Sequence, residues 1–220
     1  GLKWRKGNVK SNIKKILFVF GTRPEAIKLA PVINTARASN SLKVSICVTA
    51  QHRELLDQVL NVFNIISDYD LNIMVSNQSL FYSTSQILIA LETVIKRELP
   101  DLVLVQGDTT TAFVASLSAF YLGIKVGHIE AGLRTERKDE PFPEEMNRRC
   151  VSVLADFHFA PTLRAKMNLL KEGVKEDSIF VTGNTIVDAL KYMLPIARQK
   201  KMNEITPLLK KDKRKILVTA

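Results

Sequence analysis

The chain has 220 residues, of which 46% are hydrophobic and 25% charged, and its formal net charge is +10. This is ordinary globular composition, and the length suits one α/β domain or two small ones. No apolar stretch approaches the length of about 20 residues that a membrane span needs. The apolar segment ILFVF, which follows the basic start of the chain, is too short for the core of a signal peptide. We therefore expect a globular protein with no membrane partner.

The positive charge is concentrated at the two ends of the sequence. Residues 1–15 carry six Lys and Arg with no acid, and residues 198–215 carry a net charge of +6. The ends together carry +12, so residues 16–197 carry 10 − 12 = −2. A nucleic-acid-binding face would need basic residues along an element of this central part. We interpret the charge as solvated termini and expect no nucleic-acid partner.

The two cysteines, Cys47 and Cys150, have no CxxC spacing and too few neighbours for a zinc site. We interpret them as reduced, buried thiols of a cytosolic protein, and therefore expect a cytoplasmic location. The three histidines, His52, His128 and His158, are not spaced as metal ligands either. No metal site is predicted.

Apolar runs alternate with helical patterns along the chain. The runs indicate strands at 16–20, 44–48, 68–73 (a short edge strand), 102–105, 124–129, 157–160 and 179–181. The helical patterns lie at 24–33, 54–62, 79–96, 111–121, 144–154, 163–171 and 186–196. Strands that alternate with crossover helices predict an α/β fold with a doubly wound, mostly parallel sheet.

Composition divides the chain into four segments. Residues 1–14 form a basic N-terminal extension, and residues 15–197 form the α/β domain. Residues 198–214 are charged and are typical of an interdomain linker. Residues 215–220 begin a new apolar run that cannot bury itself alone. We interpret it as the first strand of a further domain; the alternative is that it docks as an extra strand.

Three acids lie where predicted elements begin or end: Asp108, Glu130 and Glu144. Carboxylates that share a cleft can be driven to different pKa values and can act as acid and base. A structural alternative stays open for each. Asp108 and Glu144 suit the starts of helices, as a cap or as a complement to the helix dipole. Glu130 could form a salt bridge with a basic residue of the following loop, such as Arg134. The next acid, Glu145, is placed to pair with Arg149 at i+4.

Two strand-to-helix turns carry candidate ligand groups. The turn at 21–23 offers free backbone N–H groups at a helix start, and Arg23 adds a bidentate phosphate donor. Alternatively, Arg23 pairs with Glu25 or another nearby carboxylate. The turn at 49–53 places Gln51 and His52 at the carboxyl end of a strand, the usual ligand side of an open α/β sheet. For His52, helix capping is the alternative.

Several long motifs resemble one family. They are FGTRPEAIKLAPVI, TAQHRELLDQVL, YDLNIM, VLVQGDTTTAFVASLSAFY, VGHIEAGLRT, PFPEEMNRR and VTGNTIVDAL. Together, in this order, they are similar to the non-hydrolysing UDP-N-acetylglucosamine 2-epimerase family, from about Lys15 to Ala220. The resemblance implies a Rossmann-like N-terminal domain of a glycosyltransferase-B-like fold, in which two such domains flank a deep cleft. It also implies conversion of UDP-N-acetylglucosamine to UDP-N-acetylmannosamine through elimination and re-addition of UDP, with no cofactor.

The motifs identify the positions of this sequence that correspond to the family's site residues. The positions that match catalytic acids are Asp108, Glu130 and Glu144. The positions that match substrate-binding residues are Arg23, Lys28 and Arg148. The positions that match a second, activating UDP-sugar site of some bacterial members are Gln51 and His52.

The resemblance covers only an N-terminal half. The family continues beyond the position of Ala220 with a His-Arg-Arg motif, whose His is catalytic, and with a second domain that binds UDP. We therefore expect the partners to be a UDP-sugar, a second copy of the chain in a homodimer, and a C-terminal half, which could be separately encoded. Two alternatives remain: an inert or regulatory UDP-sugar-binding or dimerisation module, and another UDP-sugar enzyme of this architecture, such as a glycosyltransferase or a hydrolysing epimerase.

We predict that the purified 220-residue chain turns over UDP-N-acetylglucosamine at no more than a trace rate, because half of the expected cleft is missing. A product assay on the purified chain measures this. If the chain is one half of the enzyme, mixing it with a C-terminal half should restore turnover. If the chain is an inert module, the mixture should remain inactive. Clear turnover by the chain alone would show that the prediction is wrong.

Overall fold

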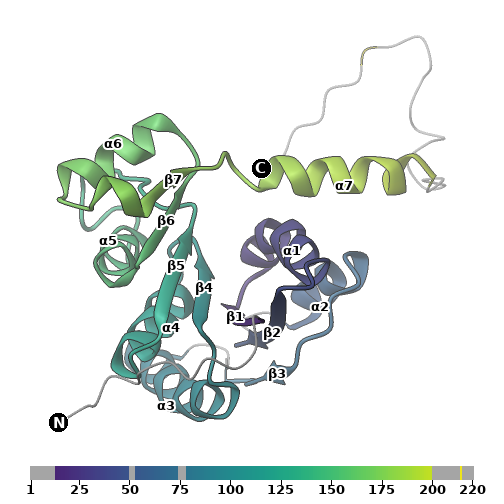
Figure 1. The fold of residues 1–220 in the computed structure, drawn as a ribbon, viewed down its shortest axis with the longest axis horizontal. Coiled ribbons are helices and arrows are strands. Elements are labelled where there is room, and N and C mark those ends of the chain that lie inside the picture. Colours follow the sequence, from purple (N-terminus) through teal and green to yellow (C-terminus); the bar gives the residue numbers. More distant parts are fainter. Residues whose placement is uncertain (1–12, 50–52, 74–77, 200–213, 215–220) are drawn as a thin grey trace.

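The computed structural model describes residues 13–49, 53–73, 78–199 and 214. These residues form one seven-stranded sheet in which every neighbouring pair of strands is parallel (Figure 1). The strand order is β3-β2-β1-β4-β5-β6-β7. The strands are β1 (Lys14–Phe20), β2 (Leu42–Val48), β3 (Tyr69–Asp70), β4 (Leu102–Gln106), β5 (Lys125–Ile129), β6 (Phe157–Ala160) and β7 (Ile179–Val181). The predicted doubly wound parallel sheet is confirmed.

Seven helices and one short 3₁₀ turn are found in the described ranges. They are α1 (Arg23–Arg37), α2 (Arg53–Val62), α3 (Leu80–Glu98), α4 (Thr110–Tyr121), α5 (Glu144–Leu154), α6 (Leu163–Lys171), η1 (Glu176–Ser178) and α7 (Ile186–Gln199). The expected end of the last helix is wrong, because α7 continues into the first residues of the predicted linker. The remaining linker residues except Arg214, and the segments 1–12 and 215–220, lie outside the described residues. None of the helices in the described ranges is long and apolar enough to cross a membrane.

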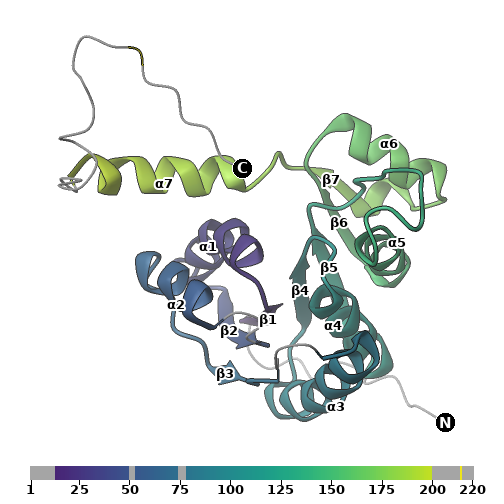
Figure 2. The same ribbon diagram turned by 180° about the vertical axis from the view of Figure 1, so that it is seen from behind.

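The sheet is covered on both faces, which explains its continuous apolar strands. All four residues from Leu17 to Phe20 in β1 are fully buried. Helices α1 and α2 lie on one face of the sheet and α3 and α4 on the other (Figure 2). Phe18 and Phe20 pack with α1 and α2, whereas Leu17 and Val19 pack with α3 and α4. A strand buried on both faces has no polar side to alternate with, so its sequence reads as one apolar run.

The sheet reverses its winding between β1 and β4, which lie side by side although α1 to α3 separate them in the sequence. In an open α/β sheet, a crevice forms at this reversal, outside the carboxyl ends of the strands. The turns that follow β1, β4 and β5 meet there. The topology therefore brings residues from three distant parts of the sequence to one place.

The two free cysteines differ in burial. Cys47 in β2 is buried, as expected, and this burial raises the pKa of its thiol to about 12. Cys150 on α5 is only partly buried, so the expectation of two buried thiols is wrong for this residue. The neighbouring Val151 faces the core, and adjacent helical residues point about 100° apart.

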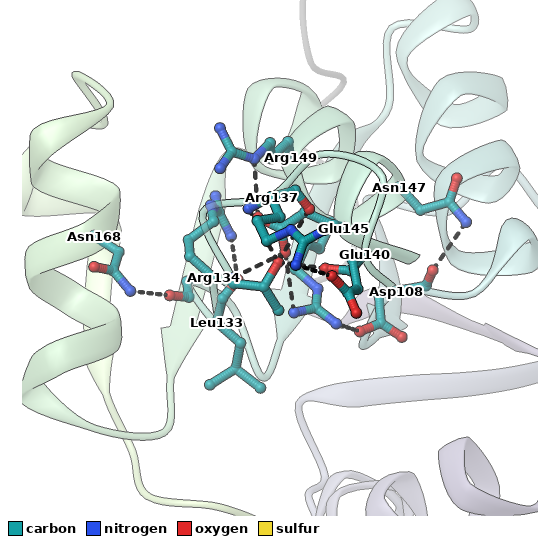
Figure 3. Close-up of polar contacts among 12 residues, drawn as sticks. Asp108, Leu133, Arg134, Arg137, Glu140, Glu145, Asn147, Arg149 and Asn168 are labelled. Atoms are coloured by element: carbon teal, nitrogen blue, oxygen red, sulfur yellow. Dashed lines mark hydrogen bonds and ion pairs between the residues drawn. The ribbon is translucent and has the colours of Figure 1, made fainter. Parts of the chain in front are cut away.

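The loop after β5 is fixed to α6. Asn168 Nδ2 donates to the Gly132 carbonyl at 2.9 Å (Figure 3). Arg134 Nε and Nη2 donate to the two carboxylate oxygens of Glu172 at 2.8 and 2.6 Å. Arg134 therefore does not form the predicted pair with Glu130, because the loop turns its side chain toward α6.

Gly132 offers a test of this packing. Its φ is +89°, and a Cβ at this position would lie 2.3 Å from the Ala165 carbonyl oxygen. We predict that Gly132→Ala lowers the free energy of unfolding by about 3 kcal/mol, from backbone strain plus overpacking. Gly173 is the matched control, since its φ is +84° and nothing lies within 4 Å of the added Cβ. Gly173→Ala should cost only about 1 kcal/mol. Urea unfolding measures both, and equal losses would contradict the packing argument.

Candidate active site

A cleft of about 540 Å³ lies at the carboxyl ends of β1, β4 and β5. We call it the acid cleft, because three of its residues are carboxylates predicted from the sequence to be catalytic. Lys28, predicted to bind substrate, also lines it. The lining residues are Thr22, Pro24, Glu25, Lys28, Gln106, Gly107, Asp108, Thr109, Glu130, Leu133 and Glu144.

Glu25 braces two of the turns that form the cleft. Its carboxylate accepts hydrogen bonds from the backbone N–H groups of Gly21 and Thr22, at 3.0 and 2.7 Å, and from Thr109 Oγ1 at 2.7 Å. Thr109 lies 84 residues away in the turn after β4. Burial raises the pKa of Glu25, and these hydrogen bonds oppose the rise. Glu25, in the first turn of α1, is therefore a buried link between two turns.

Arg23 lies outside the acid cleft. Its exposed side chain lines a separate, mostly apolar groove of about 380 Å³ that is formed by α1, α2 and α7. In the described part of the chain Arg23 has no carboxylate partner, so the alternative pairing with Glu25 is wrong. Glu25 is instead buried and satisfied by other donors. Gln51 and His52, the predicted second UDP-sugar site, lie outside the described residues.

Glu130 is held by side chains from three other elements. Its Oε2 accepts from Lys28 Nζ at 2.6 Å and from Gln106 Nε2, and its Oε1 accepts from Asn184 Nδ2 at 2.8 Å. The residue has a φ of +67° at the end of β5. Such left-handed conformations are uncommon for residues other than glycine and gather at functional sites. The carboxylate is thus fixed by both its backbone and its partners.

Two partners of Glu130 were missed in the sequence, although each carried a signal. Gln106 is the polar last residue of the otherwise apolar strand β4. Asn184 belongs to the turn after β7, within the motif VTGNTIVDAL. Neither signal indicates which acid the residue contacts.

Asp108 does not cap a helix. The N-cap of α4 is the next residue, Thr109, whose Oγ1 accepts from the backbone N–H of Ala112 at 3.0 Å. This leaves the Asp108 carboxylate to pair with Arg148 on α5. The Asp108 carbonyl accepts from Asn147 Nδ2 at 3.0 Å (Figure 3). The capping interpretation is therefore wrong, and Asp108 is tied to α5 by two contacts.

The three carboxylates form one electrostatic group. Burial raises the pKa of Asp108, the Arg148 guanidinium opposes this, and the negative charges of Glu130 and Glu144 raise it further. Glu144 is the first residue of α5 and makes no capping hydrogen bond, because the N-cap position is Pro143. Its place in the first turn, suited to the helix dipole, is as expected.

Glu145 positions Arg148. The Glu145 side chain is fully buried and accepts from Arg149 Nε at 3.0 Å, the i+4 pair expected from the sequence. It also pairs with Arg148 Nη1 at 3.2 Å and accepts from the Thr135 N–H at 3.2 Å. Arg148 was predicted to bind substrate, but the structure places it between Glu145 and Asp108 and outside the lining of the acid cleft. We therefore interpret it as a residue that positions Asp108.

His128 lies beneath the cleft as a structural donor. It is fully buried in β5, and its Nε2–H donates to the Gly107 carbonyl at 2.7 Å. Burial lowers the pKa of His128 to about 3, so the ring is neutral at physiological pH. Within the described ranges, no three His, Cys, Asp or Glu side chains are grouped in a way that could hold a metal ion.

The arrangement suits proton transfer beside a developing positive charge. The raised pKa of Asp108 favours a carboxyl group that can carry a proton. The fixed carboxylate of Glu130 provides a negative charge that needs no reorganisation during a reaction. Lys28 provides a cation at the same place.

Comparison with known proteins gives close matches. A family model described as UDP-N-acetylglucosamine 2-epimerase matches residues 34–220. A UDP-N-acetylglucosamine 2-epimerase of Neisseria meningitidis serogroup A is 53% identical over 210 residues, which are 94% of this chain and 56% of the relative. The crystal structure of a UDP-GlcNAc 2-epimerase from Neisseria meningitidis, bound to UDP-GlcNAc, has a TM-score of 0.81 at 56% identity. It matches 84% of this chain and 50% of that one.

The fold also resembles a more distant structure. The apo form of a lipopolysaccharide outer core galactosyltransferase has a TM-score of 0.59 at 16% identity, over 77% of this chain and 45% of that one. This likeness shows the fold alone and agrees with the expected glycosyltransferase-B-like architecture. The chain spans about half the length of the curated relatives it matches.

Arg148→Gln tests how Asp108 is held. We predict a further rise in the pKa of Asp108, because the variant removes the positive charge that favours its ionised form. Carboxyl ¹³C NMR titration measures this, with Asp108→Asn to assign the signal. Arg149→Gln is the matched control, since Arg149 shares Glu145 with Arg148. Equal shifts in both variants would contradict a specific Arg148–Asp108 interaction.

Proposed function

The chain belongs to the UDP-N-acetylglucosamine 2-epimerase family, and on this premise we propose that it supplies the acidic wall of an active site that interconverts UDP-N-acetylglucosamine and UDP-N-acetylmannosamine. The observation that carries the proposal is the meeting of Asp108, Glu130, Glu144 and Lys28 at the point where the sheet reverses. Their positions at this cleft support the roles expected from the motifs.

The reaction begins with loss of UDP. The proton on sugar C2 is not activated by a carbonyl group, so the bond from C1 to the UDP oxygen must weaken first. UDP leaves with the bonding electron pair, and a carboxylate removes the C2 proton as the C1=C2 double bond forms. Re-addition of UDP to the resulting 2-acetamidoglucal returns a proton to the other face of C2 and gives the epimer.

Proton transfer at C2 and stabilisation of the charge at C1 can be assigned to different acids of the three. A proton that leaves one face and returns to the other requires carriers on both sides of the sugar. Asp108, with its raised pKa, and Glu144, at the start of α5, are our candidates for these carriers. Glu130 is our candidate for stabilising the oxocarbenium-like charge at C1, since three donors hold its carboxylate in place.

We propose that a second domain supplies the rest of the substrate cleft. The relatives extend over about twice the matched length, and a nucleoside diphosphate needs more contacts than Lys28 provides. Arg23, at the neighbouring groove, is our candidate for a phosphate contact beside the acid cleft. We propose that the second domain binds most of the UDP group, whether one polypeptide or two carry the halves.

We also propose a homodimer and a cytoplasmic location. Neighbouring helices α3 and α4 expose large apolar side chains, including those of Phe81, Ile89, Phe120 and Tyr121. Exposed apolar patches of this kind favour association. The free cysteines are compatible with a reducing compartment. Sedimentation velocity of the chain at several concentrations measures its association.

The activity test combines the chain with the C-terminal half of the Neisseria meningitidis relative in deuterated water. We expect NMR to show both UDP-sugars, with deuterium incorporated at C2. Asp108→Asn and Glu130→Gln should each lower kcat by about 100-fold or more, because each removes a charge or a proton carrier. Glu176→Gln, which alters an exposed acid paired with Lys166, is the control and should retain turnover.

Two results would contradict this proposal. Release of free N-acetylmannosamine would indicate a hydrolysing enzyme. Absence of turnover in a mixture that forms a folded complex would favour an inert binding or dimerisation module.

A further inference from the structure

Asn184 makes two hydrogen bonds that point in different directions. It lies in the turn between β7 and α7, where its Oδ1 accepts from the backbone N–H of Ile186 at 3.1 Å. This bond satisfies a free donor at the start of α7. Its Nδ2 donates to Glu130 Oε1 at 2.8 Å, across 54 residues of sequence. One side chain thus joins a helix start to an acid of the cleft.

The bond to Glu130 is not duplicated by another described side chain. Lys28 and Gln106 both donate to Oε2, whereas Asn184 is the described donor to Oε1. A carboxylate held at one oxygen can rotate about its terminal bond, which is a soft torsion. Held at both oxygens, it keeps one orientation toward the acid cleft.

Among the described residues, helix α7 packs against α1 and against Phe63, just after the end of α2. It lies along α1 and apart from strands β6 and β7, to which its turn connects it (Figure 1). Ala189 is the buried residue of this attachment, Met193 packs against the same core, and the Tyr192 ring stacks on Phe63 with centroids 5.0 Å apart. In the part of the chain that the structure describes, α7 is thus held against α1 and α2, and its first turn is joined to Glu130 through Asn184.

We propose that Asn184 is a positioning residue that couples the first turn of α7 to the orientation of the Glu130 carboxylate. A displacement of that turn would move the amide that holds Oε1, and loss of the carboxylate would release the side chain that caps the helix. Coupling between two places must act in both directions. The effect of this coupling on turnover rests on the proposed function. The coupling itself can be measured in a protein that has no enzymatic activity.

Amide hydrogen exchange of Ile186 in the full chain tests the coupling directly. Glu130→Ala should speed this exchange by about fivefold or more, because Asn184 loses its second partner. Glu130→Gln, which keeps an acceptor oxygen and guards against a variant that misfolds, should change it much less. Asp108→Ala is the matched control, since Asp108 lines the same cleft without contacting Asn184. The coupling is overturned if Glu130→Ala leaves the exchange unchanged, or if Asp108→Ala speeds it equally.

Kinetics in the mixture with the relative's C-terminal half test the positioning role. Asn184→Asp retains an oxygen that caps α7 but loses the amide donor, so we expect kcat to fall roughly 10- to 100-fold, with KM changed by less than about twofold. Asn168→Asp makes the same chemical change on α6, where the amide donates to the Gly132 carbonyl, and should leave kcat near the wild-type value.

The outcomes separate the two proposals. An unchanged kcat in Asn184→Asp overturns the positioning role. Absence of turnover in the wild-type mixture contradicts the proposed function instead, and the exchange of Ile186 still decides whether Asn184 couples α7 to Glu130.

Discussion

The ion pair between Lys28 on α1 and Glu130 at the end of β5 is the contact on which the site depends. It joins α1, which follows β1, to the end of β5 at 2.6 Å, and β1 and β5 lie on either side of β4. Gln106 from β4 and Asn184 from the turn before α7 also donate hydrogen bonds to the Glu130 carboxylate. A carboxylate with this many donors keeps its charge in one place, which is what stabilisation of a developing cation requires.

Two further carboxylates hold the elements around the cleft in place. Glu25 ties the turn after β1 to the turn after β4, and Glu145 holds Arg148 against Asp108. Both are almost completely buried. Removing one partner of a buried, hydrogen-bonded charge leaves the other partner unsatisfied. These braces therefore fix the acids more firmly than exposed ion pairs would.

Much of the architecture was predictable because its signals are local. The seven strands and seven helices follow from apolar runs and helical spacing, and their alternation indicates the doubly wound sheet. The ordered motifs identified the family, and the family match confirms that identification. The structural alternatives, in which Asp108 caps a helix and Glu130 pairs with Arg134, do not hold, because each depended on which of several possible partners a side chain reaches.

Local patterns in the sequence were enough to predict the element order, the parallel sheet, the family and three of the four acids that line the cleft. The folded chain was needed to identify the side-chain partners: Arg148 for Asp108, Glu172 for Arg134, and Asn184 for Glu130. Local patterns could not indicate these partners because the residues of each pair lie far apart along the chain. Periodicity and turn chemistry act over a few residues, whereas these contacts join groups 38 to 54 residues apart. Such groups meet only once the sheet has ordered its strands.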